Sequence, residues 1–261
     1  MLLGVNIDHI AVLREARKIN DPNPLDALGI CKLAGANQIT IHLREDRRHM
    51  HDEDTKNIIN LSQLPINFEC SINDEMIQIA CKYKPHRVTL VPENREEVTT
   101  EGGLDLKTNF TKIQNAVKEL QKNNIEVSLF IDPNKNMINL SKKLEVEWIE
   151  LHTGSFANIY AMLFSGLERT HHTIKELELP RDILQNKFKE SIKKIKKSSK
   201  MAKKLNIKVA AGHGLNYENV HHMTNIKQIE ELNIGQSIIA RSIFTGLEKA
   251  IVDLKKLIKK I

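Results

Sequence analysis

Residues 38–71, QITIHLREDRRHMHDEDTKNIINLSQLPINFECS, contain the repeating unit that decides the fold. Two short runs, Gln38–Leu43 and Ile66–Ser71, have the β-branched and apolar composition of buried strands. Between them, Asp54–Leu61 has the spacing of an amphipathic helix. A strand, a helix and another strand in succession are typical of α/β proteins with a parallel sheet.

The same alternation extends over the whole chain of 261 residues. It predicts a closed (β/α)8 barrel, because eight strands are each followed by a helix. A doubly wound open sheet is the alternative, but it usually has fewer strands at this length. The expected strands are Leu2–Asp8, Gln38–Leu43, Ile66–Ser71, Arg87–Pro92, Val127–Asp132, Trp148–Thr153, Lys208–Gly212 and Glu231–Gly235. The expected helices are Pro24–Ala34, Asp54–Leu61, Asp74–Tyr83, Asn109–Asn123, Lys135–Leu144, Lys187–Leu205, Glu218–Thr224 and Ser237–Lys260.

The chain is expected to form a single domain over residues 1–261, because no linker rich in Pro, Gly or Ser divides it. Residues 155–187 are longer than a strand-to-helix connection requires, so we expect a helical insertion there. The sequence leaves open whether this insertion is a lid or an oligomer contact.

Composition excludes several classes of protein. The chain is 41% hydrophobic and has no run of 18 apolar residues, which argues against disorder and against a membrane-spanning helix. Its first residues resemble a buried strand and not a signal peptide, and its three cysteines form no CxxC motif. We therefore expect a cytoplasmic protein without a disulfide framework or a structural zinc site.

The net charge of +6 suggests either nucleic acid or small phosphorylated molecules as partners. Nine of the lysines lie in Lys187–Lys204, opposite an apolar face of helical spacing. This pattern favours a solvated outer helix over a nucleic-acid patch, and an aromatic content of 4% leaves little surface for base stacking. We expect no nucleic-acid partner.

Polar residues gather at the carboxyl ends of the predicted strands, where a barrel of this kind carries its active site. Leaving a His or Glu unpaired in an apolar strand costs several kcal/mol, so these residues indicate function. Glu150 is as consistent with a structural partner as with a catalytic group. His152 is expected to point away from Glu150, as a core or helix-facing histidine. The residues at the strand ends are Asn6, Asp8, His9, His42, Arg44, Glu69, Glu150, His152, His213 and Gly235.

Two groups of residues suit phosphate binding. The segment His42–His49 contains three arginines, whose guanidinium groups match phosphate oxygens in pairs. Glycine turns at Gly212–Gly214 and Gly235 follow the seventh and eighth strands, and residues 97–103, EVTTEGG, suggest a mobile cover. Two anion sites would fit two phosphorylated substrates. No metal, nucleotide or dinucleotide motif is present, which leaves acid–base chemistry by His and Glu.

Long motifs spread over nearly the whole chain resemble the pyridoxine 5'-phosphate synthase family of vitamin B6 biosynthesis. They are GVNIDHIAVLREAR, TIHLREDRRH, LVPENREEVTTEGG, IELHTG, AGHGLNYENV and ELNIGQSIIARSI. The resemblance implies a (β/α)8 barrel with additional helices, assembled as a homo-octamer that is a tetramer of dimers. It implies condensation of 1-deoxy-D-xylulose 5-phosphate with 3-amino-2-oxopropyl phosphate to pyridoxine 5'-phosphate, phosphate and water, without a metal or other cofactor.

The resemblance also assigns roles to residues. It makes His42 and Glu69 proton acceptors and His213 a proton donor, and it assigns Glu150 to transition-state stabilisation. The amino-ketone phosphate site would comprise Asn6, Arg17, Gly214, Gly235 and Gln236. The deoxyxylulose phosphate site would comprise Asp8, His9, Arg44, His49 and Thr99.

The chain departs from the family pattern at three places: Gln236 replaces a usual His, Phe156 replaces a common Tyr, and residues 155–187 are longer than usual. Three other functions remain as alternatives. A barrel isomerase or lyase acting on one sugar phosphate would require a lysine at a strand end, a metal-dependent hydrolase would require a metal, and an RNA-binding protein would use Lys187–Lys204.

Overall fold

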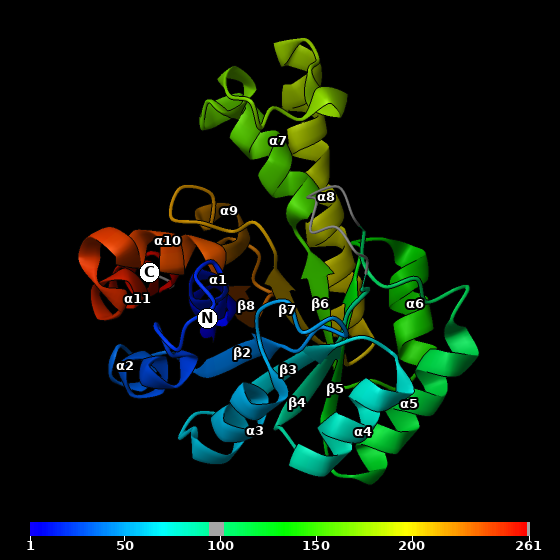
Figure 1. Cartoon of the computed structure of the whole chain (residues 1–261). Helices are drawn as coiled ribbons and strands as arrows, with labels where there is room; N and C mark the ends of the chain where they lie inside the picture. The colour runs from blue at the N-terminus through cyan, green and yellow to red at the C-terminus, as the bar shows by residue number, and fades with distance from the viewer. Residues whose placement is uncertain (94–101, 260–261) are drawn as a thin grey trace.

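In a computed structural model, which describes residues 1–93 and 102–259, eight parallel strands form a closed barrel in the order β1 to β8 (Figure 1). This confirms the predicted fold class, and each strand lies within two residues of its expected bounds. The strands are β1 Leu2–Asn6, β2 Gln38–His42, β3 Ile66–Cys70, β4 Arg87–Leu90, β5 Glu126–Ile131, β6 Trp148–His152, β7 Lys208–Gly212 and β8 Glu231–Ile234.

The helices surround the barrel, and several of them differ from the prediction. One helix begins at Arg181 and not at Lys187, and another begins at His221 and not at Glu218. The first strand ends at Asn6, and the chain then forms a short helix that the sequence analysis missed. The predicted helix Ser237–Lys260 is divided in two at Gly246, whose φ of 78° does not fit an α-helix. The α-helices are α1 Asp8–Glu15, α2 Ala27–Leu33, α3 Asp52–Leu61, α4 Asp74–Tyr83, α5 Phe110–Lys122, α6 Lys135–Lys143, α7 Gly154–Phe164, α8 Arg181–Lys204, α9 His221–Thr224, α10 Gln236–Thr245 and α11 Leu247–Ile258.

The inside of the barrel is polar. Arg87 on β4 donates from Nη1 to Oε1 of Glu231 on β8, at 2.8 Å, so this ion pair crosses the barrel interior. The guanidinium of Arg87 also lies 3.8 Å from the ring centroid of Trp148. Along β2, β3 and β4, apolar residues alternate with polar ones and pack under the helices. The strands with His42 and Glu69 are therefore half polar, and not fully apolar as the sequence suggested.

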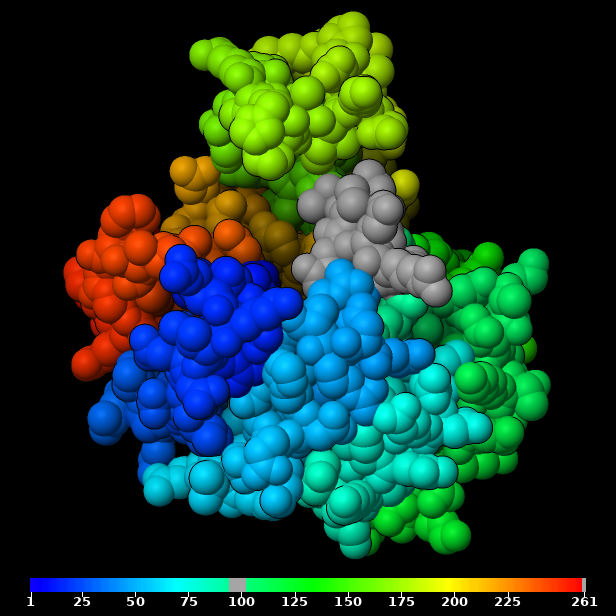
Figure 2. Space-filling model, in the orientation of Figure 1, coloured from blue at the N-terminus to red at the C-terminus, as the bar shows by residue number. Residues whose placement is uncertain are grey.

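A helical hairpin projects from the barrel between β6 and β7. It consists of α7, two 3-10 turns at Leu167–Arg169 and Lys175–Leu177, and the outer part of α8. The hairpin stands clear of the body (Figures 1 and 2) and has an apolar cluster of its own, centred on Ile159, Met162 and Leu184. The hairpin includes residues 155–187, for which the sequence analysis predicts a helical insertion.

The lysine-rich stretch forms the inner part of α8. Its apolar face packs on the barrel through Ile195 and Ala202, which are buried, as the helical spacing predicts. None of the helices among residues 1–93 and 102–259 has the length and apolar character needed to cross a membrane.

Candidate active site

The carboxyl ends of the strands bring the predicted acid–base residues together. His42 and Glu69 are direct neighbours in the register between β2 and β3. Both residues are partly accessible to solvent, whereas Asp8 and Glu150 are buried, with exposed fractions of 5% and 3%. The negative charges of Glu150 and Asp8 both act on Glu69. The mouth of the barrel therefore brings the imidazole of His42 close to three carboxyl groups.

Burial is the main cause of the raised pKa values of Glu69 and Glu150. It raises the pKa of Glu69 well above its ordinary value, and the charges of Glu150 and Asp8 raise it further. Burial also raises the pKa of Glu150 to about 7, although Asn233 donates from Nδ2 to Glu150 Oε2 at 2.6 Å and so favours the charged form. A carboxyl group with a pKa of about 7, as in Glu150, can both take and give protons near neutral pH.

His42 is the basic group beside these carboxyl groups. Burial, followed by the positive charges of His49 and Arg44, lowers the pKa of His42 to about 3. Its Nε2 is buried and has no hydrogen-bond partner among the described residues. The imidazole is therefore neutral at physiological pH, and a buried ring nitrogen is available for a reacting group.

Asp8 connects the first two strands at the mouth. It begins α1, and its Oδ1 accepts the backbone N–H of His42 at 2.9 Å. Its Oδ2 accepts from Nδ2 of Asn6 at 2.8 Å. These hydrogen bonds fix the end of β2, and with it the position of the His42 side chain.

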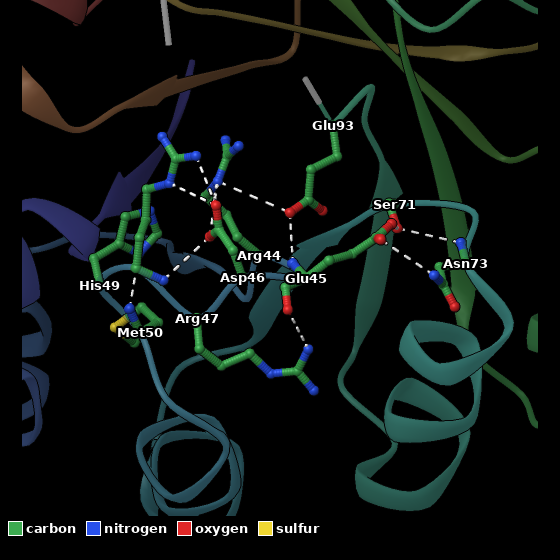
Figure 3. A network of polar contacts seen from close by, with 10 residues as sticks. Arg44, Glu45, Asp46, Arg47, His49, Met50, Ser71, Asn73 and Glu93 are labelled. Carbon is green, nitrogen blue, oxygen red and sulfur yellow. Dashed lines mark hydrogen bonds and ion pairs between the residues drawn. The ribbon is translucent and has the colours of Figure 1, made fainter. Parts of the chain in front are cut away.

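The loop after β2 holds a cation beside the mouth (Figure 3). Arg44 is only 6% exposed, and its Nε lies 3.6 Å from Asp46 and 3.8 Å from Glu93. His49 is 5% exposed, and its Nδ1 accepts the backbone N–H of Met50 at 2.8 Å. Nε2 is therefore the ring nitrogen of His49 that can donate to an anion.

Arg14 anchors this loop from α1, although the sequence analysis gave it no role. Its two terminal nitrogens donate to both carboxylate oxygens of Asp54, at 2.8 and 2.7 Å. Nη2 also donates to the backbone oxygen of His49 at 2.9 Å. A paired and largely buried arginine thus fixes the main chain next to His49.

A second place suited to an anion lies at the amino end of α10. Gly235 precedes this helix, and a Cβ on it would lie 2.9 Å from the Cβ of Asn6. Gln236 is exposed in the first turn, where backbone N–H groups have no partner within the helix. The structure therefore brings Asn6, Gly235 and Gln236 together, on a different strand end from Arg44.

His213 stands after β7 in the left-handed region of backbone conformation, with φ of 77°. The hydroxyl of Thr153 fixes this backbone, because its Oγ1 is within hydrogen-bond distance, 2.6 Å, of the carbonyl oxygens of both Gly212 and His213. Gly212 must be glycine, because a Cβ would lie 2.1 Å from Oε1 of Glu150. Gly214 also has a positive φ, of 78°. The turn thus exposes the His213 side chain at the mouth.

The expected orientation of His152 was wrong. Residues two apart on a strand share a face, so His152 lies on the same side as Glu150. Its ring is 5.0 Å from the ring of His213 and 5.0 Å from that of Phe130, and its Nδ1 lies 3.4 Å from Oδ1 of Asp132. This hydrogen bond lowers the pKa of Asp132.

Some predicted residues are not brought into this cluster. Arg17 is exposed beyond the end of α1, a helix whose eight residues rise about 12 Å from Asp8. Thr99, and most of the expected cover at residues 97–103, lie outside the described residues. His9 lies in the first turn of α1. In the described parts of the chain, no three His, Cys, Asp or Glu side chains are grouped to hold a metal ion.

Two further residues near the site have a signal in the sequence. Asp132 and Asn233 lie at the ends of predicted strands, where the rule that selected Glu69 also applies. Arg14 carried no such signal, because its contact with His49 joins segments 35 residues apart.

Solved structures with the same architecture show the fold alone, because their sequence identity is low. A 3-hexulose-6-phosphate synthase superposes with a TM-score of 0.60 and 11% identity, covering 99% of this chain and 100% of the other. The N-(5'-phosphoribosyl)anthranilate isomerase of Pyrococcus furiosus gives 0.59 and 12%, with full coverage of both chains.

Relatives named pyridoxine 5'-phosphate synthase are much closer in sequence. That of Aliarcobacter butzleri is 71% identical over 259 residues, or 99% of each chain. That of Sulfurovum sp. is 64% identical over 99% of this chain and 100% of its own. The family model described as pyridoxal phosphate biosynthesis protein PdxJ matches residues 3–260. The chain therefore belongs to the PdxJ family of pyridoxal phosphate biosynthesis proteins.

Proposed function

We propose that this protein is a pyridoxine 5'-phosphate synthase. It condenses 1-deoxy-D-xylulose 5-phosphate with 3-amino-2-oxopropyl phosphate, and the products are pyridoxine 5'-phosphate, phosphate and water. The observation that carries the proposal is the placement of His42, Glu69 and Glu150 in one barrel mouth, between a cationic loop and a helix amino end.

The acid–base groups suit the proton transfers of this condensation. When the amine adds to the ketone and water leaves, a C–N bond forms and a C–O bond breaks, so the departing oxygen must receive a proton. His213, exposed at the mouth, is proposed as that donor. Neutral His42 and the carboxylate form of Glu69 are proposed to accept protons from nitrogen and carbon. Glu150 is proposed to stabilise positive charge that develops on the substrates.

The two phosphate groups are proposed to bind on opposite sides of these residues. Arg44 and His49, with Asp8, His9 and Thr99, would hold the deoxyxylulose phosphate. Asn6, Arg17, Gly214, Gly235 and Gln236 would hold the amino-ketone phosphate. Supporting this division, buried Arg44 offers a guanidinium and the first turn of α10 offers backbone N–H groups.

The decisive experiment is a chelator-treated assay with both substrates together and with each omitted in turn, following pyridoxine 5'-phosphate and orthophosphate. Equal amounts of both products, formed only when both substrates are present, are expected. Turnover of a single sugar phosphate would instead indicate the isomerase or lyase alternative. That alternative lacks a lysine at the inward strand ends among the described residues. Loss of activity with chelator would contradict catalysis without a metal.

A first prediction concerns Glu69. Replacing Glu69 by Gln keeps the shape of the side chain but removes its ability to accept a proton, so turnover should be abolished. Binding of both phosphorylated substrates should persist, because neither phosphate site includes this side chain. Isothermal titration and the product assay measure the two effects separately. A variant with a near-normal rate would overturn the role of Glu69.

We also propose that the protein acts in the cytoplasm as a homo-octamer, a tetramer of dimers. Apolar side chains exposed on α10 support self-association: Ile243 is 65% exposed and Phe244 is 88% exposed. Light scattering after size-exclusion chromatography tests the assembly, and a monomeric mass at micromolar concentration would contradict it.

A further inference from the structure

Two imidazole rings meet beside Gly154 at the edge of the barrel mouth. The rings of His152 and His213 have centroids 5.0 Å apart and lie edge to face at 65°. A Cβ on Gly154 would lie 2.4 Å from Nε2 of His152 and 3.1 Å from Cδ2 of His213. Both rings therefore pack against the same glycine, and any larger side chain there would push them away.

The ring of His152 is held by the carboxylate of Asp132. Nδ1 of His152 lies 3.4 Å from Oδ1 of Asp132, and a carboxylate only accepts hydrogen bonds, so Nδ1 carries a proton. The same Oδ1 accepts the backbone N–H of Gly103 at 3.1 Å. His152 is 7% exposed and also packs against Phe130, so its ring orientation is fixed on three sides.

We propose that Asp132 and His152 are positioning residues that hold the ring of His213 in its reactive orientation. This inference rests on the proposed role of His213 as proton donor. The backbone of His213 is already fixed by Thr153, so the remaining freedom is rotation of its side chain. The edge-to-face contact with His152 restricts that rotation, in the way that outer partners orient a catalytic histidine.

The test compares kcat and KM for four variants of the full-length enzyme. Asp132→Ala and His152→Phe should lower kcat roughly 10- to 100-fold, because the donor ring is less well placed. KM for both substrates should change little, since neither phosphate site includes these residues. Asp132→Asn should recover most of the lost kcat, because its amide oxygen still accepts from His152 Nδ1. Gly154→Ala should behave like His152→Phe.

His86→Phe is the matched control. His86 also faces a carboxylate, with Nε2 3.8 Å from Glu126, but it lies before β4, at the amino ends of the strands, and its side chain is 52% exposed. It should leave kcat unchanged. Thermal unfolding of each variant separates loss of fold from loss of orientation.

The outcomes distinguish this inference from the proposed function. If His213→Ala is inactive while folded Asp132→Ala and His152→Phe turn over at the wild-type rate, the positioning role is overturned and the role of His213 stands. If His213→Ala itself turns over normally, the assignment of His213 as donor fails. Equal losses in Asp132→Ala and Asp132→Asn would also overturn the positioning role, because the hydrogen bond would then not be its basis.

Discussion

The His42 side chain combines a buried ring nitrogen with two positive neighbours. Its pKa of about 3 means that the free enzyme presents a neutral base throughout the physiological range. A phosphate bound by Arg44 and His49 would cancel the charges that help to lower this pKa. Binding of the deoxyxylulose phosphate would therefore strengthen His42 as a base when the substrate arrives.

We predict that His42 does not titrate between pH 5 and 8 in the free enzyme, given its pKa of about 3. Side-chain nitrogen NMR, with the signal assigned by a His42→Gln variant, measures this directly. Adding deoxyxylulose phosphate should move the titration to higher pH. A midpoint near the ordinary value of about 6.5 in the free enzyme would contradict the prediction.

Glu150 makes stability depend on pH. Its pKa is about 7 in the folded protein, against an ordinary value of 4.5, so the folded state binds more protons between these two values. The free energy of unfolding should therefore fall as pH rises from 4.5 to 7, by about 3 kcal/mol for a shift of this size. Glu150→Gln, which mimics the protonated acid, should lose most of this dependence. Urea unfolding at several pH values measures it, and an unchanged slope in the variant would disprove the assignment.

At the scale of elements, α1 and the loop after β2 are tied by Arg14. This arginine uses both terminal nitrogens on Asp54 and a third contact on the His49 main chain, a geometry that lysine cannot reproduce. The position of α1 therefore fixes the position of the loop after β2, which is proposed to bind phosphate.

Arg14→Lys should raise KM for the deoxyxylulose phosphate roughly tenfold, because the loop would bind phosphate with less fixed geometry. KM for the amino-ketone phosphate should remain within about twofold, since that site uses α10. Arg241→Lys is the control, because Arg241 pairs with Asp253 in the α10–α11 pair, at 2.9 Å. Equal effects on both KM values would argue against a local action of Arg14.

The strands were predictable from sequence, whereas parts of the site were not. Composition and period are local, so Gln38–Leu43 and Ile66–Ser71 were found within one residue of β2 and β3. The rule that strand ends form the site then selected His42 and Glu69, which are neighbours in the register of β2 and β3. The orientation of His152 was predicted wrongly because the two-residue period of a strand was not applied. The short helix α1 and the contact of Arg14 depend on packing between distant segments.

At the scale of the whole molecule, an ion pair lies inside the barrel at the amino ends of its strands. Arg87 and Glu231 have side chains only 5% and 2% exposed, so neither charge is solvated by bulk water. Removing one partner of such a pair leaves the other charge buried without compensation.

Arg87→Met should lower the free energy of unfolding by about 3 to 5 kcal/mol, measured by urea denaturation. The double variant Arg87→Met, Glu231→Gln should recover part of the loss, because the uncompensated charge is gone. Lys203→Met is the matched control: Lys203 pairs with Glu230 at 2.8 Å, but the side chains are 54% and 35% exposed, so the cost should stay below about 1 kcal/mol. Similar losses for Arg87→Met and Lys203→Met would refute this account.

The hairpin of α7 and α8 has a consequence for how its length can vary among relatives. Its two arms run antiparallel and share one apolar cluster, so residues added to one arm need partners on the other. A helix turn takes about 3.6 residues, and a whole turn on each arm adds roughly seven. Relatives with longer or shorter hairpins should therefore differ in steps of about one heptad, and not by arbitrary numbers of residues.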